Sequence, residues 1–562
     1  MTKLNYKSAL SFGAGALMIT SSLFLGSCGS ERSPVTGWAY NDPQNGGFEK
    51  VPYEEQETGP GLVLVEGGTF TFGRAEQDVT YDWNNVPRRV TVSSFYMDET
   101  EVSNFSYLEY LYWTNRVFGP SYPEVYVTAL PDTLVWREKM AYNEPYVEYY
   151  LRHPAYRDYP VVGVNWLQAN DFCSWRTDRV NEFILIREGL LEHVPTATET
   201  DYFSTESYLA GKWGGQLKQK LPSFDEQAPE RDVRMEDGIF LPKYRLPTEA
   251  EWEFAAYGLI GNTIGERITD RRIYPWNGHG VRNPDEKYIG QIMANFVRGG
   301  GDYMGTSGWL NDNADVTSPV YSYWPNDYGL YNMAGNVSEW VLDVYRPLTS
   351  EDADEFRPFR GNVFQTQQRD PIDNTIRVND TGAVYQKFVH VVAQPGTYGA
   401  NGSSADSLVV DSILVSIPGR VMWRDVSIKY AQDNLDERRN YKSSDYRNYN
   451  DGDVNSTLQY QNGEGAITGL DGGNTQSIVT GGTLNGVTSL NPGFTSGLMY
   501  QYTKTTLIND VAHVYKGGSW KDRAYWLNPG TRRFLDQRQS LAYLGFRCAM
   551  TRVGSPTGLG GK

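Results

Sequence analysis

The sequence predicts a mixed fold of short strands and a few capped helices, with little regular secondary structure. The chain of 562 residues contains 57 Gly and 28 Pro, which favours many turns. It also contains 40 Tyr and 15 Trp, whose side chains combine a large apolar area with a polar edge and suit irregular cores. With 40% hydrophobic residues, the chain can build one large domain with insertions, or two or three domains.

The N-terminus has the pattern of an export signal. Residues 1–27 combine Lys3 and Lys7 with a nearly uncharged stretch, and the sequence LGSC follows, ending in Cys28. This resembles a bacterial lipoprotein signal, in which Cys28 is acylated; the alternative is an ordinary secretory signal with a chance cysteine. Several acyl chains give stable anchoring, so we expect a membrane-tethered protein outside the cytoplasm. Residues 28–61 are polar and predict a tether.

Strands are expected where the globular part begins. The run LVLV at residues 62–65, followed by Gly67 and Gly68, predicts a strand that enters a hairpin. Residues 90–92 and 95–97 predict a second pair of strands.

A helix is expected to begin after Ser103 and to end near Phe118, before Gly119. Its buried stripe is predicted to consist of four residues. These are Phe105, Leu108, Leu111 and Tyr112.

Two further helices carry start signals. Asn165 with Gln168 resembles a capping box, and the apolar positions that follow predict that Cys173 points into the core. Thr248 with Glu251 forms a full capping box, and Gly258 predicts the end of that helix.

Charge and metal-ligand patterns exclude several functions. The net charge of −17 would repel a phosphate backbone, so nucleic acid is not an expected partner. The five His residues are far apart, and no CxxC is present, so a zinc or His-based metal site has no support.

Six blocks, in order, resemble the formylglycine-generating enzyme (sulfatase-modifying factor) family. They are VLVEGGTFTFG (63–73), FYMDETEVSNFSY (95–107), PVVGVNWLQANDFCSW (160–175), YRLPTEAEWEFAAYG (244–258), YGLYNMAGNVSEWV (328–341), and GGSW with GFRC (517–520, 545–548). The resemblance implies an α+β fold similar to C-type lectins, with low regular secondary structure and large insertions. It assigns residues 62–345 and 511–552 to one discontinuous domain. Residues 346–510 are then an insertion, and residues 553–562 are a flexible tail.

The enzymes of this family oxidise a cysteine with O2 and hold Cu(I) on two cysteines that follow the GGS-aromatic motif. Aligned on GGSW, those positions are Asp522 and Leu527. A carboxylate is a hard, weak ligand for Cu(I), and leucine is no ligand. The resemblance therefore implies a catalytically inactive member without copper. A non-haem iron branch of the fold needs a His cluster that this sequence lacks.

The resemblance also implies two kinds of structural feature. Cys173 and Cys548 match a disulfide pair of the family. Two stretches match calcium-binding positions, and oxygen ligands of this type suit Ca2+. The first set consists of the Asn332 and Glu339 side chains with the backbone carbonyls of Gly335 and Val337, and the second is Asn295 and Asp312 with neighbouring carbonyls. The alternative is that Asn332 and Asn336 serve tight turns while Glu339 forms a salt bridge.

A narrower resemblance concerns the gliding-motility lipoproteins of the type IX secretion apparatus. It rests on residues 36–49, on the Tyr-rich stretch 130–166 and on the large insertion. It implies a non-enzymatic scaffold or assembly subunit, lipid-anchored at the outer membrane on its periplasmic face. Its expected partners are other components of that apparatus, such as the related lipoprotein GldK. The alternative is a lectin-like or peptide-binding surface lipoprotein.

Overall fold

The computed structural model describes residues 31–45, 48–74, 85–225, 228–261, 272–298, 314, 316–345, 365–370, 373–379, 384–392, 407–415, 417–425, 483–484, 487–488 and 511–554. The signal at 1–27, Cys28, Asp312, most of the insertion and residues 555–562 lie outside this range. Within it, no helix has the length and apolar character that crossing a membrane requires.

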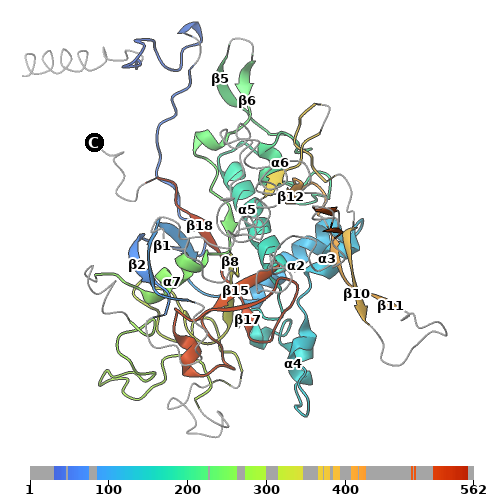
Figure 1. The fold of residues 1–562 in the computed structure, drawn as a ribbon. Helices are drawn as coiled ribbons and strands as arrows, with labels where there is room; N and C mark the ends of the chain where they lie inside the picture. Colours follow the sequence, from blue (N-terminus) through green and yellow to red (C-terminus); the bar gives the residue numbers. More distant parts are fainter. Residues whose placement is uncertain are drawn as a thin grey trace, which may run out of the picture. The chain divides into compact units, whose positions relative to one another are not determined.

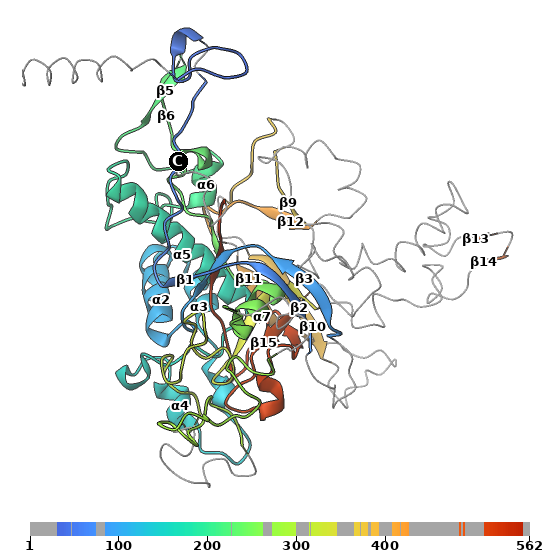
Figure 2. The same ribbon diagram turned by 90° about the vertical axis from the view of Figure 1, so that its left-hand side faces the viewer.

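By internal contacts the chain divides into two units, a small one of residues 1–55, 185–192 and 216–240 and a large one of the rest. The large unit holds two four-stranded sheets (Figures 1 and 2). In the first sheet the strand order is β1 (Leu62–Val65), β4 (Phe95–Asp98), β18 (Ala549–Thr551) and β7 (Tyr244–Arg245). In the second it is β16 (Arg533–Asp536), β15 (Ala512–Lys516), β8 (Ser338–Val344) and β17 (Leu544–Gly545). β18 and β15, which both come from residues 512–551, are therefore internal strands, one in each sheet.

The predicted strand positions are correct, but the predicted pairing is wrong. β2 (Gly68–Phe72) pairs with β3 (Arg88–Val92) in a separate ribbon, whereas β1 pairs with β4. Gly67 lies between β1 and the β2–β3 ribbon, where a Cβ atom would lie 2.3 Å from the carbonyl oxygen of Val92. Gly67 thus allows a close approach of two backbone segments and is not part of a hairpin turn between β1 and β2.

Three helices cover the sheets or connect to them. They are α2 (Asn104–Phe118), α5 (Trp166–Arg187) and α7 (Glu249–Tyr257). All three begin as predicted: Ser103 caps α2, Asn165 and Gln168 bond each other's backbone N–H groups before α5, and Thr248 and Glu251 form a capping box on α7. Gly258 ends α7 in the left-handed conformation with φ +58°.

The buried stripe of α2 differs from the prediction. Tyr107, Tyr110 and Leu111 are buried, and the Tyr107 ring stacks on Phe172 of α5 at 5.7 Å. Phe105 and Tyr112 are exposed on the other face. Leu111 belongs to both the predicted and the observed stripe, so the prediction is right for this residue and wrong for Phe105 and Tyr112.

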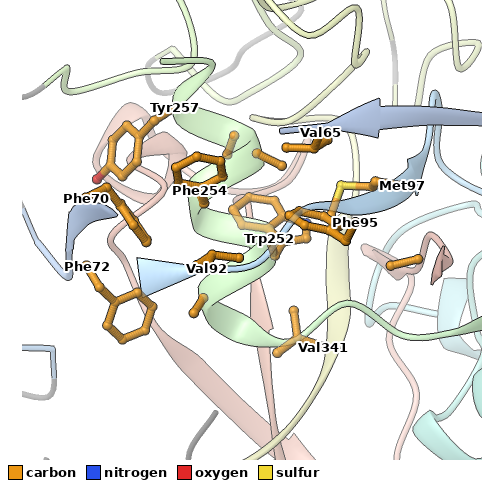
Figure 3. Packing of buried hydrophobic residues seen from close by; sticks show 14 of the residues in the cluster. Val65, Phe70, Phe72, Val92, Phe95, Met97, Trp252, Phe254, Tyr257 and Val341 are labelled. Carbon is orange, nitrogen blue, oxygen red and sulfur yellow. The ribbon is translucent and has the colours of Figure 1, made fainter. Parts of the chain in front are cut away.

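The main core lies between α7 and the strands around it (Figure 3). Trp252 and Phe254 of α7 pack against Phe70 and Phe72 of β2 and against Met97 of β4. Every residue of α7 is buried, its glutamates included. The acidic side chains of this helix therefore need partners inside the protein.

Three basic residues supply those partners, and Arg245 pairs with Glu251 at 2.7 Å. Lys516 Nζ lies 3.3 Å from Glu249 and 2.9 Å from Glu253, and Arg532 Nε lies 3.0 Å from Glu249. These last four side chains are completely buried. The C-terminal segment is thus joined to α7 by ion pairs and to β4, β7 and β8 by strand pairing.

The large unit also contains several shorter elements. They are α3 (Pro123–Ala129), η2 (Thr133–Trp136), α4 (Glu144–Tyr149), η3 (Pro154–Tyr156), α6 (Thr205–Leu209), β9 (Gln365–Gln367), β10 (Val384–Val392), β11 (Ser407–Val415), β12 (Trp423–Asp425), β13 (Thr483–Leu484), β14 (Val487–Thr488) and η9 (Ala524–Leu527). Part of the insertion contacts the core, because Arg420 pairs with Asp178 at 3.2 Å and Trp423 Nε1 donates to Glu206 at 2.8 Å.

The small unit contains η1 (Pro43–Asn45), the hairpin of β5 (Leu221–Asp225) with β6 (Ala228–Arg231), and η4 (Met235–Asp237). Arg231 joins its parts, because its guanidinium pairs with Asp237 at 2.6 Å and with Glu49 at 2.9 Å. Part of the segment expected to be a tether is therefore folded onto this hairpin.

Candidate functional site

The segment that holds the two expected copper positions follows β15. The chain turns there through Gly517 and Gly518, whose φ angles are +97° and +66°. A Cβ atom at Gly518 would lie 2.7 Å from the carbonyl oxygen of Trp526, so the returning chain leaves room only for glycine. The motif therefore retains its structural role, and the chemistry depends on the residues that follow it.

Asp522 occupies the first expected copper position and forms an ion pair with Arg533. Its two oxygens accept from Arg533 at 2.7 and 2.8 Å, and Ser519 Oγ donates to it at 2.5 Å. The guanidinium of Arg533 lies over the rings of Tyr515 and Trp526, 4.8 and 4.6 Å from their centroids. Burial lowers the pKa of Arg533, but the hydrogen-bonded Asp522 outweighs this effect and the net pKa is raised. Asp522 is a structural anion in this arrangement.

Leu527 stands at the second expected position and is completely buried. It belongs to an apolar cluster with Ile292, Ala294, Phe296 and Ala334. A side chain without a polar atom, packed among others of the same kind, supplies no ligand to a metal. Neither position therefore offers the thiolate that Cu(I) chemistry requires.

A second polar group lies beneath this segment, around Glu339 of β8. Arg547 donates to both carboxylate oxygens at 2.7 Å, and Trp252 Nε1 donates to one of them at 2.8 Å. Arg547 also donates to the carbonyl oxygen of Tyr331 at 2.8 Å. Glu339 and Arg547 are completely buried, so this bidentate pair is held in a low-dielectric interior.

Glu101 is a further buried carboxyl of this region. It accepts from Asn332 Nδ2 at 2.8 Å and from Asn336 Nδ2 at 3.0 Å. Burial, followed by the nearby negative charge of Glu339, raises the pKa of Glu101 from 4.5 to about 8. At neutral pH the folded protein therefore holds this carboxyl mainly in its protonated form.

The predicted calcium sets can be compared with this geometry. Asn332 and Asn336 both have positive φ, +52° and +61°, which suits tight turns, and both oxygens of Glu339 are occupied by donors. This is the alternative arrangement that the sequence left open. The one carboxylate of the first set is neutralised by Arg547, so the set does not fit a calcium ion with Glu339 as ligand. Asn332 Oδ1 is buried without a hydrogen-bond partner.

The contacts of the remaining predicted calcium positions do not test whether calcium binds. The Gly335 N–H donates to the Gly517 carbonyl at 2.9 Å, Val337 is buried, and Asn295 Nδ2 donates to the Val316 carbonyl at 2.7 Å. Asp312 lies outside the described residues. Among those residues, no group of three or more His, Cys, Asp and Glu side chains could hold a metal ion. Calcium binding stays a prediction.

The structure brings Cys173 of α5 and Cys548 together. Their sulfur atoms lie 3.2 Å apart as thiols, and both residues are buried, as predicted for Cys173. A covalent S–S bond measures about 2.05 Å, so the bond itself stays a prediction. Burial, then the hydrogen bond with Cys173, raises the pKa of the Cys548 thiol.

The roles of Glu101, Arg533 and Arg547 were not found from the sequence. Glu101 lies in the acidic run DETE, which is typical of a solvated loop, and it is nevertheless buried. Arg547 lies in GFRC, next to a predicted core cysteine, and this position was the available signal for a buried cation. The partner of Arg547 is 208 positions away in the chain, which no local pattern reveals.

Comparisons with known proteins agree with this architecture. The chain is 28% identical to the formylglycine-generating enzyme of Mus musculus over 287 residues, which cover 50% of this chain and 58% of that protein. It is 25% identical to "Inactive C-alpha-formylglycine-generating enzyme 2" of Bos taurus over 304 residues, covering 51% and 71%. It is 24% identical to "Chaperone protein LppX" of Paenibacillus barcinonensis over 352 residues, covering 61% and 86%.

Among solved structures, PvdO from Pseudomonas aeruginosa matches with a TM-score of 0.35 and 14% identity, covering 87% of this chain and 94% of that one. The chain spans less than two thirds of the mouse enzyme's length. A family model described as "Sulfatase-modifying factor enzyme 1-like domain" matches residues 47–389. Since this match covers more than half of the sequence, the chain belongs to the sulfatase-modifying factor enzyme 1-like family, and the α+β fold described above is the fold of that family.

Proposed function

We propose that this protein is a non-enzymatic, lipid-anchored scaffold or assembly subunit of the type IX secretion and gliding-motility machinery at the outer membrane. It resembles the gliding-motility lipoprotein GldJ. One observation supports the non-enzymatic part most directly: Asp522 is bound to Arg533, and Leu527 is buried among apolar side chains, where the enzymes carry thiols. The family includes a protein named as inactive and another named as a chaperone, so a role without oxidation has precedent there.

The Tyr-rich stretch is the proposed partner surface. Part of it covers the core, because Trp136 is buried and stacks on Trp520 with 6.1 Å between ring centroids. Another part faces solvent around α4 (Figure 1). The exposed large apolar residues of this stretch are Leu134, Met140, Tyr142 and Tyr149. Tyrosine and methionine are favoured at interface cores, so we assign these side chains to contacts with other subunits of the apparatus, such as GldK.

The scaffold role is tested by deleting the gene and scoring protein export and surface movement. We expect both to be lost. Complementation with Met140→Ser/Tyr142→Ser should express and fold but restore neither function, and it should reduce co-purification with GldK at least several-fold. Tyr112→Ser is the matched control, since Tyr112 is also exposed but lies on α2. Normal export in the deletion strain, together with glycan binding by the purified protein, would favour the lectin-like alternative.

The non-enzymatic part is tested with a thiol peptide, Cu(I) and an oxygen electrode. The wild-type protein should consume no oxygen above the protein-free rate. The double variant Asp522→Cys/Leu527→Cys should at most bind copper, because Asp522→Cys also leaves the Arg533 guanidinium without its carboxylate. Turnover by the wild-type chain at enzyme-like rates would overturn the proposal.

A further inference from the structure

Two hydrogen-bonded turns follow the predicted lipidation site in the small unit. In the first, Arg32 and Ala39 form a β-bridge, and Ser33 N–H donates to the Trp38 carbonyl at 2.8 Å. Ser33 Oγ closes the turn from inside by accepting from the N–H groups of Val35 and Thr36 at 3.2 and 3.1 Å. Residues 32–39 therefore form a defined loop, in which the direction of each side chain is set by the backbone hydrogen bonds.

The second turn is fixed by Asn41 and Lys50. Asn41 N–H donates to the Phe48 carbonyl at 2.9 Å, and the Asn41 side chain bonds both backbone groups of Lys50 at 2.7 and 3.1 Å. Lys50 also pairs with Glu31. Glu49 then joins this segment to Arg231 of the β5–β6 hairpin at 2.9 Å. The two turns are thus held together and attached to a sheet ribbon.

The turns expose large apolar side chains within a short span of chain. Val35 is 90% exposed, Trp38 59% and Phe48 68%. Two ion pairs flank these side chains, since Glu31 binds Lys50 and Glu49 binds Arg231. A folded segment that exposes aromatic and aliphatic side chains is suited to the interface of a lipid bilayer, where Trp and Phe gather.

Covalent distance identifies the surface that these side chains meet. Glu31, the first described residue, is three positions after Cys28. Three residues span at most about 11 Å even when fully extended. If Cys28 carries acyl chains, the two turns therefore begin within about 11 Å of the lipidated residue, close to the headgroups of the same membrane.

We propose that Val35, Trp38 and Phe48 form a membrane-contact site that orients the small unit on the bilayer holding its lipid anchor. This inference rests on the lipid anchor of the proposed function. It adds a contact that acylation alone does not supply, because flexible acyl chains retain a protein at a membrane without fixing the orientation of the unit next to them. Insertion of these side chains would fix that orientation.

The test uses the full-length protein in vesicles of phosphatidylethanolamine and phosphatidylglycerol, with an environment-sensitive fluorophore on single introduced cysteines. Trp38→Cys and Phe48→Cys carry the probe at the proposed contact, and Glu230→Cys, exposed on the β6 strand of the same unit, is the control. The native Cys173 and Cys548 are buried and should not label in the folded protein. Lipids brominated on the acyl chain should quench the probes at 38 and 48 at least threefold more than the probe at 230.

Mass spectrometry of the same samples reports acylation, so the two proposals fail separately. An acylated chain whose probes at 38 and 48 are quenched no more than the control overturns the contact and leaves the anchor intact. An unacylated chain that does not associate with the vesicles overturns both. Stronger quenching at 38 and 48 than at 230 supports the contact in either form, and a blue shift without lipid quenching would indicate a protein partner and overturn it.

Discussion

Replacing Glu101 with Gln should change how stability depends on pH. In the folded protein the pKa of Glu101 is raised from 4.5 to about 8. Below pH 4.5 the carboxyl is protonated in both the folded and the unfolded states, and its contribution is fully present. Between pH 4.5 and 8 the unfolded chain loses this proton while the folded chain keeps it, so stability falls as pH rises. Above pH 8 the folded state also ionises and the loss levels off.

The size of this effect follows from the shift. One pKa unit corresponds to about 1.36 kcal/mol, so a shift of about 3.5 units amounts to roughly 5 kcal/mol of unfolding free energy lost by pH 8.5. Glu101→Gln has no proton to lose, and its amide oxygen can still accept from Asn332 and Asn336. The unfolding free energy of the variant, relative to that of the wild type, should therefore rise by roughly 3–5 kcal/mol between pH 5 and pH 8.5.

Urea unfolding of both proteins at half-unit pH steps measures this difference directly. Glu109→Gln is the control, because it removes an exposed carboxyl on α2 and should leave the pH dependence unchanged. Parallel curves for the wild type and Glu101→Gln would show that the folded protein holds Glu101 ionised at neutral pH, and the reasoning from burial and from the charge of Glu339 would be refuted.

Three further outcomes are expected. Arg547→Met should lower the unfolding free energy by about 3–5 kcal/mol, because it leaves Glu339 buried without its cation, and adding Glu339→Gln should recover part of the loss in thermal melts. Occupancy of the predicted calcium sites should raise the melting temperature when calcium is added, and the absence of any shift with calcium or a chelator would count against those sites. In denaturant, Cys173 and Cys548 should alkylate only after reduction, and labelling of both without reductant would rule out their predicted disulfide.

Helix starts were the part of the fold that the sequence predicted best. Ser103, Asn165 and Thr248 each act on backbone groups two or three residues away, so the cause of each helix start lies inside a short window of sequence. The strand positions were also correct, because alternating apolar runs are local. Strand pairing was not, since it depends on segments that meet only in the folded chain.

The burial of charged residues and the identity of their partners could not be predicted from the sequence. Glu249 and Glu253 suit the first turns of α7 through the helix dipole, and this local argument gives no reason to bury them. Their partner Lys516 lies 267 and 263 positions away. The candidate site shows the same limit, because the family resemblance places Asp522 and Leu527 at the two expected copper positions but gives no sign that Arg533 binds Asp522.

The placement of β15 and β18 has a consequence for the order in which the protein can fold. β18 lies between β4 and β7, and β15 lies between β16 and β8. A chain that emerges from the ribosome or from a translocase in sequence order therefore has neither sheet complete until residues 512–551 have emerged. Until then β4 and β8 present unpaired strand edges, which invite association with other chains. The completion of both sheets thus waits for the last strands of the chain, in whatever order the other elements form.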